Sequence, residues 1–324
     1  MKAIVYYQYG PPDVLRCEEV EKTTPGDADV SLKVHAASLN PYDWHFMRGE
    51  PYAVRLMAGL GKPKNNRLGA DVAGVVDAVG RNVTQFKPGD AVYGVCQGAF
   101  AEFACTAESK VVKKPDSVSF EHAASVPIAA LTALQSLRDK GKIQPQHSVL
   151  VNGASGGVGT FGVQIAKSFG AKVTGVTSTR NLELVKSIGA DDVIDYTKRD
   201  FTKENRRFDM ILDCVGNHSF SEYRRVLNPG GKLLAAGGKT DNWMVMPIAH
   251  MVAAMAQSMF VSQKYLSLFA NMNQADLLAI NELLSSGKVM PVIDRSCTLD
   301  EIPEAIRYLE AGRARGKVVM TLSL

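Results

Sequence analysis

The sequence predicts an α/β protein with a parallel sheet, and three observations support this prediction. Residues 149–151 form a short apolar run of the kind found in buried parallel strands. A glycine-rich turn, residues 153–159, follows directly. Phe161, Ile165 and Phe169 then recur every four residues, which places them on one face of a helix. This strand, turn and helix make the first half of a βαβ unit.

The alternation of strand and helix continues downstream of this unit. Residues 172–177 are rich in β-branched side chains, 181–188 have the pattern of a helix, and 193–195 form a third short strand. Residues 208–215 and 232–236 are two further strand candidates. Repeated alternation predicts a doubly wound parallel sheet of the Rossmann type.

The glycine-rich turn is a candidate dinucleotide site. Its pattern departs from G-x-G-x-x-G, because Ala154 stands where the first glycine is expected. The simpler interpretation is a turn that only joins a strand to a helix, and the downstream alternation makes it the less favoured one. We expect Ser155, Gly156, Gly157 and Val158 to contact the pyrophosphate at the helix N-terminus.

The end of the second strand predicts which nicotinamide cofactor is bound. NAD sites usually carry Asp or Glu there, whereas this chain has Thr177, Ser178 and Arg180. Ser178 can donate a hydrogen bond to a 2′-phosphate and Arg180 can pair with it. The alternative is that Ser178 only caps the next helix and Arg180 is solvated. We expect NADPH.

Length and composition limit the functional class. A chain of 324 residues favours two domains, and a net charge of +4 without a basic run does not indicate nucleic-acid binding. Five scattered cysteines without C-x-x-C favour a reducing compartment, and no signal peptide is evident, so we expect a cytoplasmic protein. The most apolar stretch, 244–261, is too interrupted by polar residues and proline for a membrane span.

The first third of the chain predicts a β-rich domain. Residues 30–36 alternate apolar and polar side chains, as in a half-buried antiparallel strand with His35 on its solvated face. Residues 71–79 and 91–93 are further short strands. Together with the end of the chain, this part forms one predicted domain, residues 1–122 and 290–324.

Over residues 120–138 the composition changes to alanine and leucine at helical spacing. We place the domain junction in this segment. Pro127 should kink this segment or divide it into two helices. The predicted nucleotide-binding domain is therefore 123–289.

Three segments together resemble one protein superfamily. Residues 69–80 (G-A-D-V-A-G-V-V-D-A-V-G), residues 86–92 (F-K-P-G-D-A-V) and the turn at Gly153 are similar to the medium-chain dehydrogenase/reductase superfamily. Residues 38–44 (S-L-N-P-Y-D-W) narrow the resemblance to its zinc-free quinone oxidoreductase branch, which is zeta-crystallin-like. The resemblance implies a GroES-like β-rich catalytic domain, a Rossmann domain, and NADPH-dependent reduction in the cleft between them.

The same resemblance argues against a metal centre. Zinc enzymes of the superfamily place a cysteine where Asn40 stands and a histidine where Ala70 stands. Neither residue replaces a thiolate or an imidazole as a zinc ligand. Polarisation of a carbonyl then has to come from hydrogen-bond donors, which favours quinones or α,β-unsaturated carbonyls as substrates.

By resemblance, the candidate catalytic residues are Asn40, Tyr42 and Tyr52. Asn40 should also lie near the nicotinamide, with its amide donating to the substrate carbonyl or the cofactor carboxamide. Tyr42 and Tyr52 are candidate proton donors and His45 is a third, although ordinary packing explains each tyrosine equally well. Asp43 is expected to cap or anchor its loop.

Four further cofactor contacts follow from the resemblance alone: Thr132, Tyr196, Val215 and Gly237. Tyr196 would pack against the adenosine phosphate at the end of the third strand. Thr132 would contact the cofactor from the helix at the domain junction. Val215 and Gly237 would close the strand ends over the cofactor, although packing alone also explains Val215.

Two basic residues near the C-terminus and a stripe of methionines could have functional roles, but each group also has an ordinary structural explanation. Arg313 and Lys317 could reach the phosphate, but a solvated face is the favoured interpretation. Met251, Met255 and Met259 could line a lipophilic substrate pocket or a subunit contact, whereas helical core is the more frequent role of such a stripe.

The function predicted first is NADPH-dependent reduction of quinones or enones, with a lipophilic small molecule as substrate and a possible homodimer. An enoyl-thioester or alkenal reductase on the same fold is the alternative within enzymes. A non-catalytic NADPH-binding redox sensor is the alternative outside enzymes. The absence of Tyr-x-x-x-Lys excludes a short-chain dehydrogenase.

Overall fold

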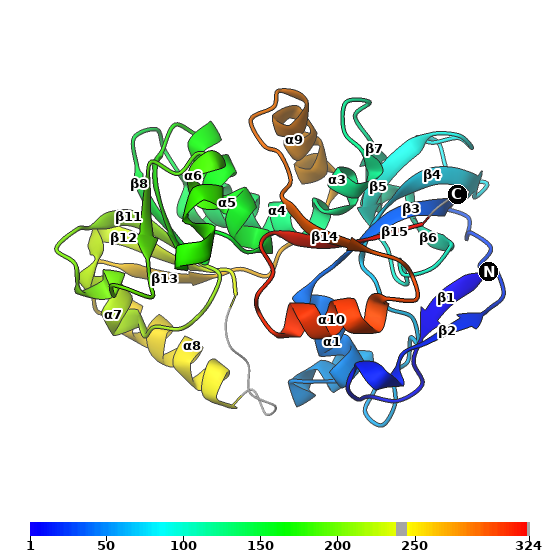
Figure 1. Cartoon of the computed structure of the whole chain (residues 1–324), viewed down its shortest axis with the longest axis horizontal. Helices are drawn as coiled ribbons and strands as arrows, with labels where there is room; N and C mark the ends of the chain where they lie inside the picture. The colour runs from blue at the N-terminus through cyan, green and yellow to red at the C-terminus, as the bar shows by residue number, and fades with distance from the viewer. Residues whose placement is uncertain (238–244, 323–324) are drawn as a thin grey trace. The chain divides into compact units, whose positions relative to one another are not determined.

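The computed structural model describes residues 1–237 and 245–322, without the side chains of 245–250. The chain divides into two compact units (Figure 1). Unit 1 comprises Met1–Ile128, Met272–Ser285 and Pro291–Leu324, and unit 2 comprises Ala129–Asn271 and Ser286–Met290. The main difference from the predicted domains is that 272–285 packs with unit 1, where Tyr93 Oη donates a hydrogen bond to Asn281 Oδ1 at 2.6 Å.

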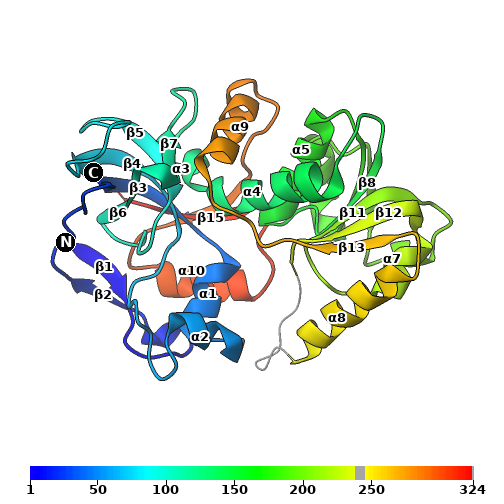
Figure 2. The same ribbon diagram turned by 180° about the vertical axis from the view of Figure 1, so that it is seen from behind.

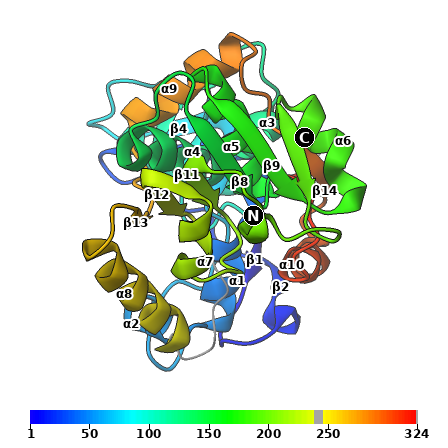
Figure 3. The ribbon, with the colours of Figure 1, turned by 90° about the vertical axis from the view of Figure 1, so that its left-hand side faces the viewer.

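Unit 2 is built on a parallel sheet of six strands in the order β10-β9-β8-β11-β12-β13. The run from β9 to β13 can be followed in Figure 3. The strands are β8 (Ser148–Asn152), β9 (Lys172–Thr177), β10 (Asp192–Asp195), β11 (Phe208–Asp213), β12 (Leu227–Ala235) and β13 (Lys264–Ser267). The order reverses after the first three strands, which is the doubly wound arrangement. The predicted Rossmann-type sheet is confirmed.

Helices connect the strands of unit 2. They are α4 (Pro127–Gln135), α5 (Gly157–Ser168), α6 (Leu182–Ser187), α7 (Phe220–Arg225) and α8 (Val245–Met259). Helix α5 packs against β8 and β9, and α6 packs against β9 and β10. Helix α8 packs against β13, and both are labelled in Figure 2. On α5, Phe161 and Ile165 are fully buried, as their spacing predicts. Gly170 follows the helix with a φ of +78°, the left-handed conformation of a C-terminal glycine cap.

Unit 1 contains a mostly antiparallel sheet in the order β14-β15-β3-β4-β5-β7, with β6 paired to β3 and a separate β1–β2 pair. The strands are β1 (Lys2–Val5), β2 (Arg16–Glu19), β3 (Asp29–Leu39), β4 (Asp71–Val79), β5 (Ala91–Val95), β6 (Phe103–Ala107), β7 (Val111–Lys113), β14 (Ile293–Cys297) and β15 (Lys317–Thr321). In Figure 1 the red strand β15 runs beside the blue strand β3. This sheet is the predicted β-rich domain.

Strand β3 is more buried than its alternating pattern predicts. It pairs with β4 along one edge and with β15 and β6 along the other, and Ser31 is fully buried, although Lys33 remains exposed. His35, expected on a solvated face, is only partly exposed and stacks on Phe120 with ring centroids 4.1 Å apart. The central position of the strand explains both differences.

The helices of unit 1 are short. They are α1 (Pro41–Arg48), α2 (Arg55–Ala58), α3 (Phe120–Ala124), α9 (Gln274–Ser285) and α10 (Ile302–Glu310). Helix α3 ends at Ala124 and α4 begins at Pro127, so the predicted division at this proline is confirmed. Helix α4 begins in unit 1, which ends at Ile128, and continues in unit 2. Across the described ranges, no helix combines the length and apolarity that crossing a membrane requires.

Candidate active site

The glycine-rich turn after β8 has the backbone of an anion-binding turn. Gly153 adopts a φ of +81°, which L side chains rarely allow. A Cβ on Gly159 would lie 2.0 Å from the carbonyl oxygen of Gly153, so the helix and the turn approach too closely for any side chain there. Gly156 is the N-cap of α5, and the unpaired N–H groups of the first helical turn, beginning at Gly157 and Val158, suit a phosphate.

Ser155 in this turn has a hydroxyl proton available for a ligand. Its Oγ accepts hydrogen bonds from Thr177 Oγ1 at 2.8 Å and from Asn181 Nδ2 at 3.0 Å. A hydroxyl has two lone pairs and one proton, so with both lone pairs used the proton is left for another acceptor. A pyrophosphate oxygen is such an acceptor, and these residues therefore fit a dinucleotide. Asn181, which the sequence analysis missed, follows directly after the predicted Ser178 and Arg180.

A carboxylate lies beside the end of β9, although β9 itself ends without one. Asp195, at the end of β10, is paired in register with Thr177. Its Oδ2 accepts from Thr179 Oγ1 at 2.5 Å and its Oδ1 accepts from Thr197 Oγ1 at 2.7 Å. These hydrogen bonds, that of Thr179 first, lower the pKa of Asp195 to about 2. The adjacent Tyr196 is 59% exposed, so its ring is accessible.

The loops after β11 and β12 lie next to the glycine-rich turn. A Cβ on Gly153 would be 2.7 Å from Val215 Cγ2, and a Cβ on Gly237 would be 2.7 Å from the carbonyl oxygen of Cys214. The structure therefore brings Val215 and Gly237 to the same edge of the sheet as the turn. Thr132 is 8% exposed and lies in α4.

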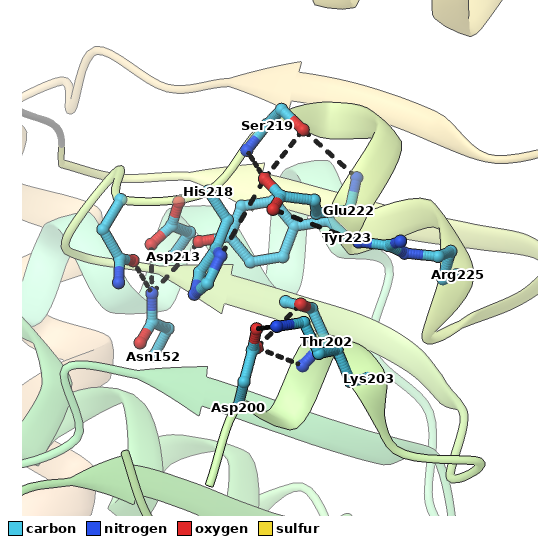
Figure 4. Close-up of polar contacts among 11 residues, drawn as sticks. Asn152, Asp200, Thr202, Lys203, Asp213, His218, Ser219, Glu222, Tyr223 and Arg225 are labelled. Carbon is cyan, nitrogen blue, oxygen red and sulfur yellow. Dashed lines mark hydrogen bonds and ion pairs between the residues drawn. The ribbon is translucent and has the colours of Figure 1, made fainter. Parts of the chain in front are cut away.

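A buried polar cluster holds the loop that carries Val215 (Figure 4). Asn152 Nδ2 donates to Asp213 Oδ1 at 2.9 Å and to Tyr223 Oη at 3.0 Å. Asp213 Oδ1 also accepts from the backbone N–H groups of Val215 at 3.1 Å and Gly216 at 3.0 Å. The sequence analysis missed this cluster. The sequence signal that could have revealed the cluster is an aspartate at the end of an apolar strand. A carboxylate buried at such a position is stable only if nearby donors form hydrogen bonds with it.

In unit 1, the start of α1 is held by a buried carboxylate. The backbone N–H of Asn40 donates to Asp43 Oδ2 at 2.7 Å, and that of Gly69 donates to Asp43 Oδ1 at 3.2 Å. The predicted anchoring role of Asp43 is confirmed. Burial, together with the nearby charge of Asp71, raises the pKa of Asp43 to about 7.

Both polar atoms of the Asn40 side chain have hydrogen-bond partners within unit 1. Its Nδ2 donates to Asp71 Oδ2 at 2.9 Å and to the carbonyl oxygen of Ser38 at 3.2 Å, while its Oδ1 accepts from Lys317 Nζ at 2.5 Å. A carboxylate only accepts and an ammonium only donates, so the orientation of the amide is determined. The expectation that this amide donates to a substrate or cofactor is therefore corrected, because both of its hydrogens are already used.

Lys317 is buried, and its predicted place on a solvated face is wrong. The residue is 3% exposed, and its Nζ lies 3.6 Å from Asp71 Oδ2. The reason is the position of β15, which is paired on one side with β14 and on the other with β3. Burial lowers the pKa of Lys317 and raises that of Asp71, while the attraction between them opposes both shifts. Arg313 is exposed, as predicted.

Unit 1 also contains a cavity of about 250 Å³ with a mixed wall, in which aromatic and apolar side chains lie beside Lys64, Asn65, Arg67 and Gln97. Its lining includes Tyr6, Tyr42, Phe46, Met57 and Cys96. The ring of Tyr42 is 39% exposed and tilts against Phe46, with centroids 4.2 Å apart. No hydrogen bond joins the Tyr42 hydroxyl to any described residue.

The other predicted proton donors are placed differently. His45 Nδ1 is 2.7 Å from the carbonyl oxygen of Glu50, so this ring atom has an internal partner. The guanidinium of Arg55 lies over the ring of Tyr52, 4.7 Å from its centroid, and Tyr52 does not line the cavity. Of the three candidates, Tyr42 alone lines this cavity.

The methionine stripe on α8 is not core. Met255 is 48% exposed and Met259 is 78% exposed, while Met251 is partly exposed. In the part of the chain that the structure describes, no three His, Cys, Asp or Glu side chains are grouped to hold a metal ion.

Comparisons with known proteins agree with this architecture. Residues 26–116 match the alcohol dehydrogenase GroES-like domain, and residues 188–320 match the zinc-binding dehydrogenase family. The chain is 36% identical to a 2-methylene-furan-3-one reductase of Solanum lycopersicum, over 99% of this chain and 79% of the relative. It is 34% identical to the mitochondrial NAD(P)H oxidoreductase RTN4IP1 of Danio rerio, over 99% of this chain and 91% of the relative.

A solved structure is similar over its whole length. The quinone oxidoreductase of Coxiella burnetii is 30% identical, with a TM-score of 0.87 over 100% of this chain and 99% of that one. The chain therefore belongs to the medium-chain dehydrogenase/reductase superfamily, in the branch of quinone oxidoreductases and enone reductases.

Proposed function

We propose that the protein is an NADPH-dependent reductase of quinones or α,β-unsaturated carbonyl compounds and that it works without zinc. The observation that carries the proposal is a cavity in unit 1 lined by Tyr42, whose hydroxyl has no acceptor among the described residues. The names of the relatives, a furanone reductase and a quinone oxidoreductase, support the same substrate classes.

The cofactor site is proposed at the edge of the unit 2 sheet. The first turn of α5 would bind the pyrophosphate, with the Ser155 proton as a further donor. Ser178 and Arg180 would hold the 2′-phosphate, and Asp213 would fix the loop that carries Val215. When bound, the reduced nicotinamide supplies a hydride to an electron-poor carbon of the substrate.

The protein's part in the chemistry is to stabilise the negative charge that forms on the substrate oxygen. Tyr42 would donate its hydroxyl proton in a hydrogen bond to that oxygen. Burial, with a contribution from Asp43, raises the pKa of Tyr42, so the hydroxyl remains a donor at neutral pH. A zinc ion is not needed for this role. The positions expected to supply zinc ligands hold Ala70, which has no ligand atom, and Asn40, whose oxygen already accepts from an ammonium.

Substrate class is tested by following the loss of reduced-nicotinamide absorbance with quinones, 2-alkenals and an enoyl thioester. Turnover of a quinone or a 2-alkenal supports the proposal. Preference for the thioester favours the enoyl-thioester alternative. Cofactor binding without turnover of any of them favours a non-catalytic sensor.

A long-chain alkenal should be reduced faster than a short polar enone if the substrate is lipophilic. Sedimentation tests whether the protein is a homodimer.

Cofactor preference is tested with Arg180→Ala. The variant should raise the KM for NADPH at least about tenfold more than the KM for NADH, because only NADPH has the phosphate that a guanidinium pairs with. Arg206→Ala is the matched control, since Arg206 pairs with Asp192 at the start of β10, the opposite end of that strand from Asp195. Equal effects of Arg180→Ala on the two cofactors would contradict the NADPH assignment.

A further inference from the structure

Tyr6 is a buried tyrosine whose hydroxyl has no hydrogen-bond partner among the described residues. The residue follows β1, is 2% exposed and packs within the core of unit 1. Other buried tyrosines are paired: Tyr93 Oη donates to Asn281 Oδ1 at 2.6 Å, and Tyr223 Oη accepts from Asn152 Nδ2 at 3.0 Å. Buried tyrosine hydroxyls normally find a partner, so the exception requires an explanation.

The cavity in unit 1 provides that explanation. Tyr6 and Tyr42 both line it. The Tyr6 hydroxyl oxygen is not fully enclosed by protein, so we take it to be accessible from the cavity that this residue lines. One cavity thus has two phenol groups in its wall, and neither phenol proton has an acceptor within the described chain.

We propose that Tyr6 is a second catalytic donor, which binds the substrate carbonyl oxygen together with Tyr42. The proposal rests on the proposed reductase function. A carbonyl oxygen has two lone pairs and can accept from both hydroxyls at once. Two fixed donors stabilise a developing oxyanion more than one does.

The proposed role of Tyr6 belongs to the reduction of an enone. A C–H bond forms at the β-carbon with the transferred hydride, and the π electrons of the C=C bond move toward the carbonyl oxygen to give an enolate. Tyr6 and Tyr42 hold that enolate oxygen by hydrogen bonds. A proton from water then forms the α C–H bond, and the products are the saturated ketone and the oxidised cofactor.

The surroundings of Tyr6 keep it a donor. Burial, with the nearby Tyr9, Tyr42 and Asp43, raises its pKa above its usual range. The hydroxyl is therefore protonated wherever the enzyme operates. Because this proton has no acceptor in the described part of the chain, replacing Tyr6 with phenylalanine removes no hydrogen bond there.

The test compares Tyr6→Phe with two controls. Tyr6→Phe should lower kcat with an enone about 100-fold, leave the Kd for NADPH within about twofold and leave the urea midpoint unchanged. Tyr7→Phe is the neighbouring control; Tyr7 is 53% exposed and its hydroxyl donates to Glu18 at 2.8 Å, so kcat should not change. Tyr93→Phe is the buried control and should lower the urea midpoint without lowering kcat.

A spectroscopic measurement separates this proposal from the proposed function. With the oxidised cofactor present, the carbonyl stretching band of bound 2-cyclohexenone should lie at lower frequency in the wild type than in solution. In Tyr6→Phe the frequency of this band should lie between the wild-type value and the solution value. If the wild type turns over enones but Tyr6→Phe changes neither kcat nor the band, Tyr6 is not a donor and the reductase assignment stands. If the wild type neither shifts the band nor reduces any enone or quinone, both are overturned.

Discussion

Replacing Lys317 with methionine should destabilise unit 1 by about 3–5 kcal/mol. The variant removes an ammonium 3.6 Å from Asp71 Oδ2 and leaves that carboxylate buried. At an effective dielectric constant of about 20, the lost attraction at this distance is roughly 4–5 kcal/mol. Asn40 Oδ1 also loses its donor, which costs about 1 kcal/mol more. Methionine fills a similar volume, so the expected effect is electrostatic rather than a cavity effect.

Two features of the site limit the expected loss. Asp71 keeps hydrogen bonds from Asn40 Nδ2, Ser38 Oγ and the backbone N–H of Ile128. It can also take up a proton, because burial already raises its pKa. An acid whose pKa is higher in the folded than in the unfolded state destabilises the fold increasingly as pH rises. The loss in Lys317→Met should therefore be smaller near about pH 5 than near about pH 8.

Urea unfolding, followed by the change in midpoint at constant m-value, measures the effect. The matched control is Lys186→Met, since Lys186 Nζ lies at the same 3.6 Å from Glu183 but the two side chains are 60% and 90% exposed. That variant should lose under about 1 kcal/mol. Adding Asp71→Asn to Lys317→Met should recover part of the loss. A loss in Lys317→Met no larger than in the control would refute a buried ion pair.

Three further outcomes are expected. Gly159→Ala should weaken NADPH binding at least about tenfold in a fluorescence titration, because its Cβ would meet the Gly153 carbonyl oxygen at 2.0 Å; an unchanged Kd contradicts the close approach. Asp43 has a folded pKa of about 7, well above that of an unfolded aspartate, so its contribution to the free energy of unfolding should fall as pH rises from about 4 to 7, by on the order of 4 kcal/mol in all. Urea unfolding of Asp43→Asn at several pH values should show a flatter pH dependence than the wild type. Iodoacetamide should label the exposed Cys17 before Cys96, whose thiol pKa burial raises; mass spectrometry showing the reverse order would contradict the burial of the Cys96 thiol.

The sequence predicted the nucleotide-binding sheet well because its signals are local. An apolar strand, a glycine turn and a helix with Phe161 and Ile165 on one face each show themselves within a few residues. Asp43 was predicted equally well, because it caps a helix that starts within three residues of it. In these places local pattern and tertiary structure agree.

The errors fall where contacts join distant segments. Lys317 looks like a surface lysine at the start of a strand, and only the pairing of β15 with β3 shows that it is buried. Asn40 was assigned a free amide because its three internal partners come from three different strands. Tyr6 showed no signal, since a tyrosine after an apolar strand is ordinary and its missing partner is visible only in three dimensions. The clue to Lys317 was Asp71, a carboxylate in an apolar strand that implies a cation.

The ion pair between β15 and β4 also constrains the order in which the chain matures on the ribosome. Lys317 and its acceptor Asn40 are 277 positions apart, so the first strands emerge long before their cation is synthesised. Most of unit 2, by contrast, is a single stretch from Ala129 to Asn271 and depends on no such late arrival. The nucleotide-binding half of the protein can therefore form while the other half still exposes an uncompensated carboxylate, and chaperones or proteases would meet that incomplete half during translation.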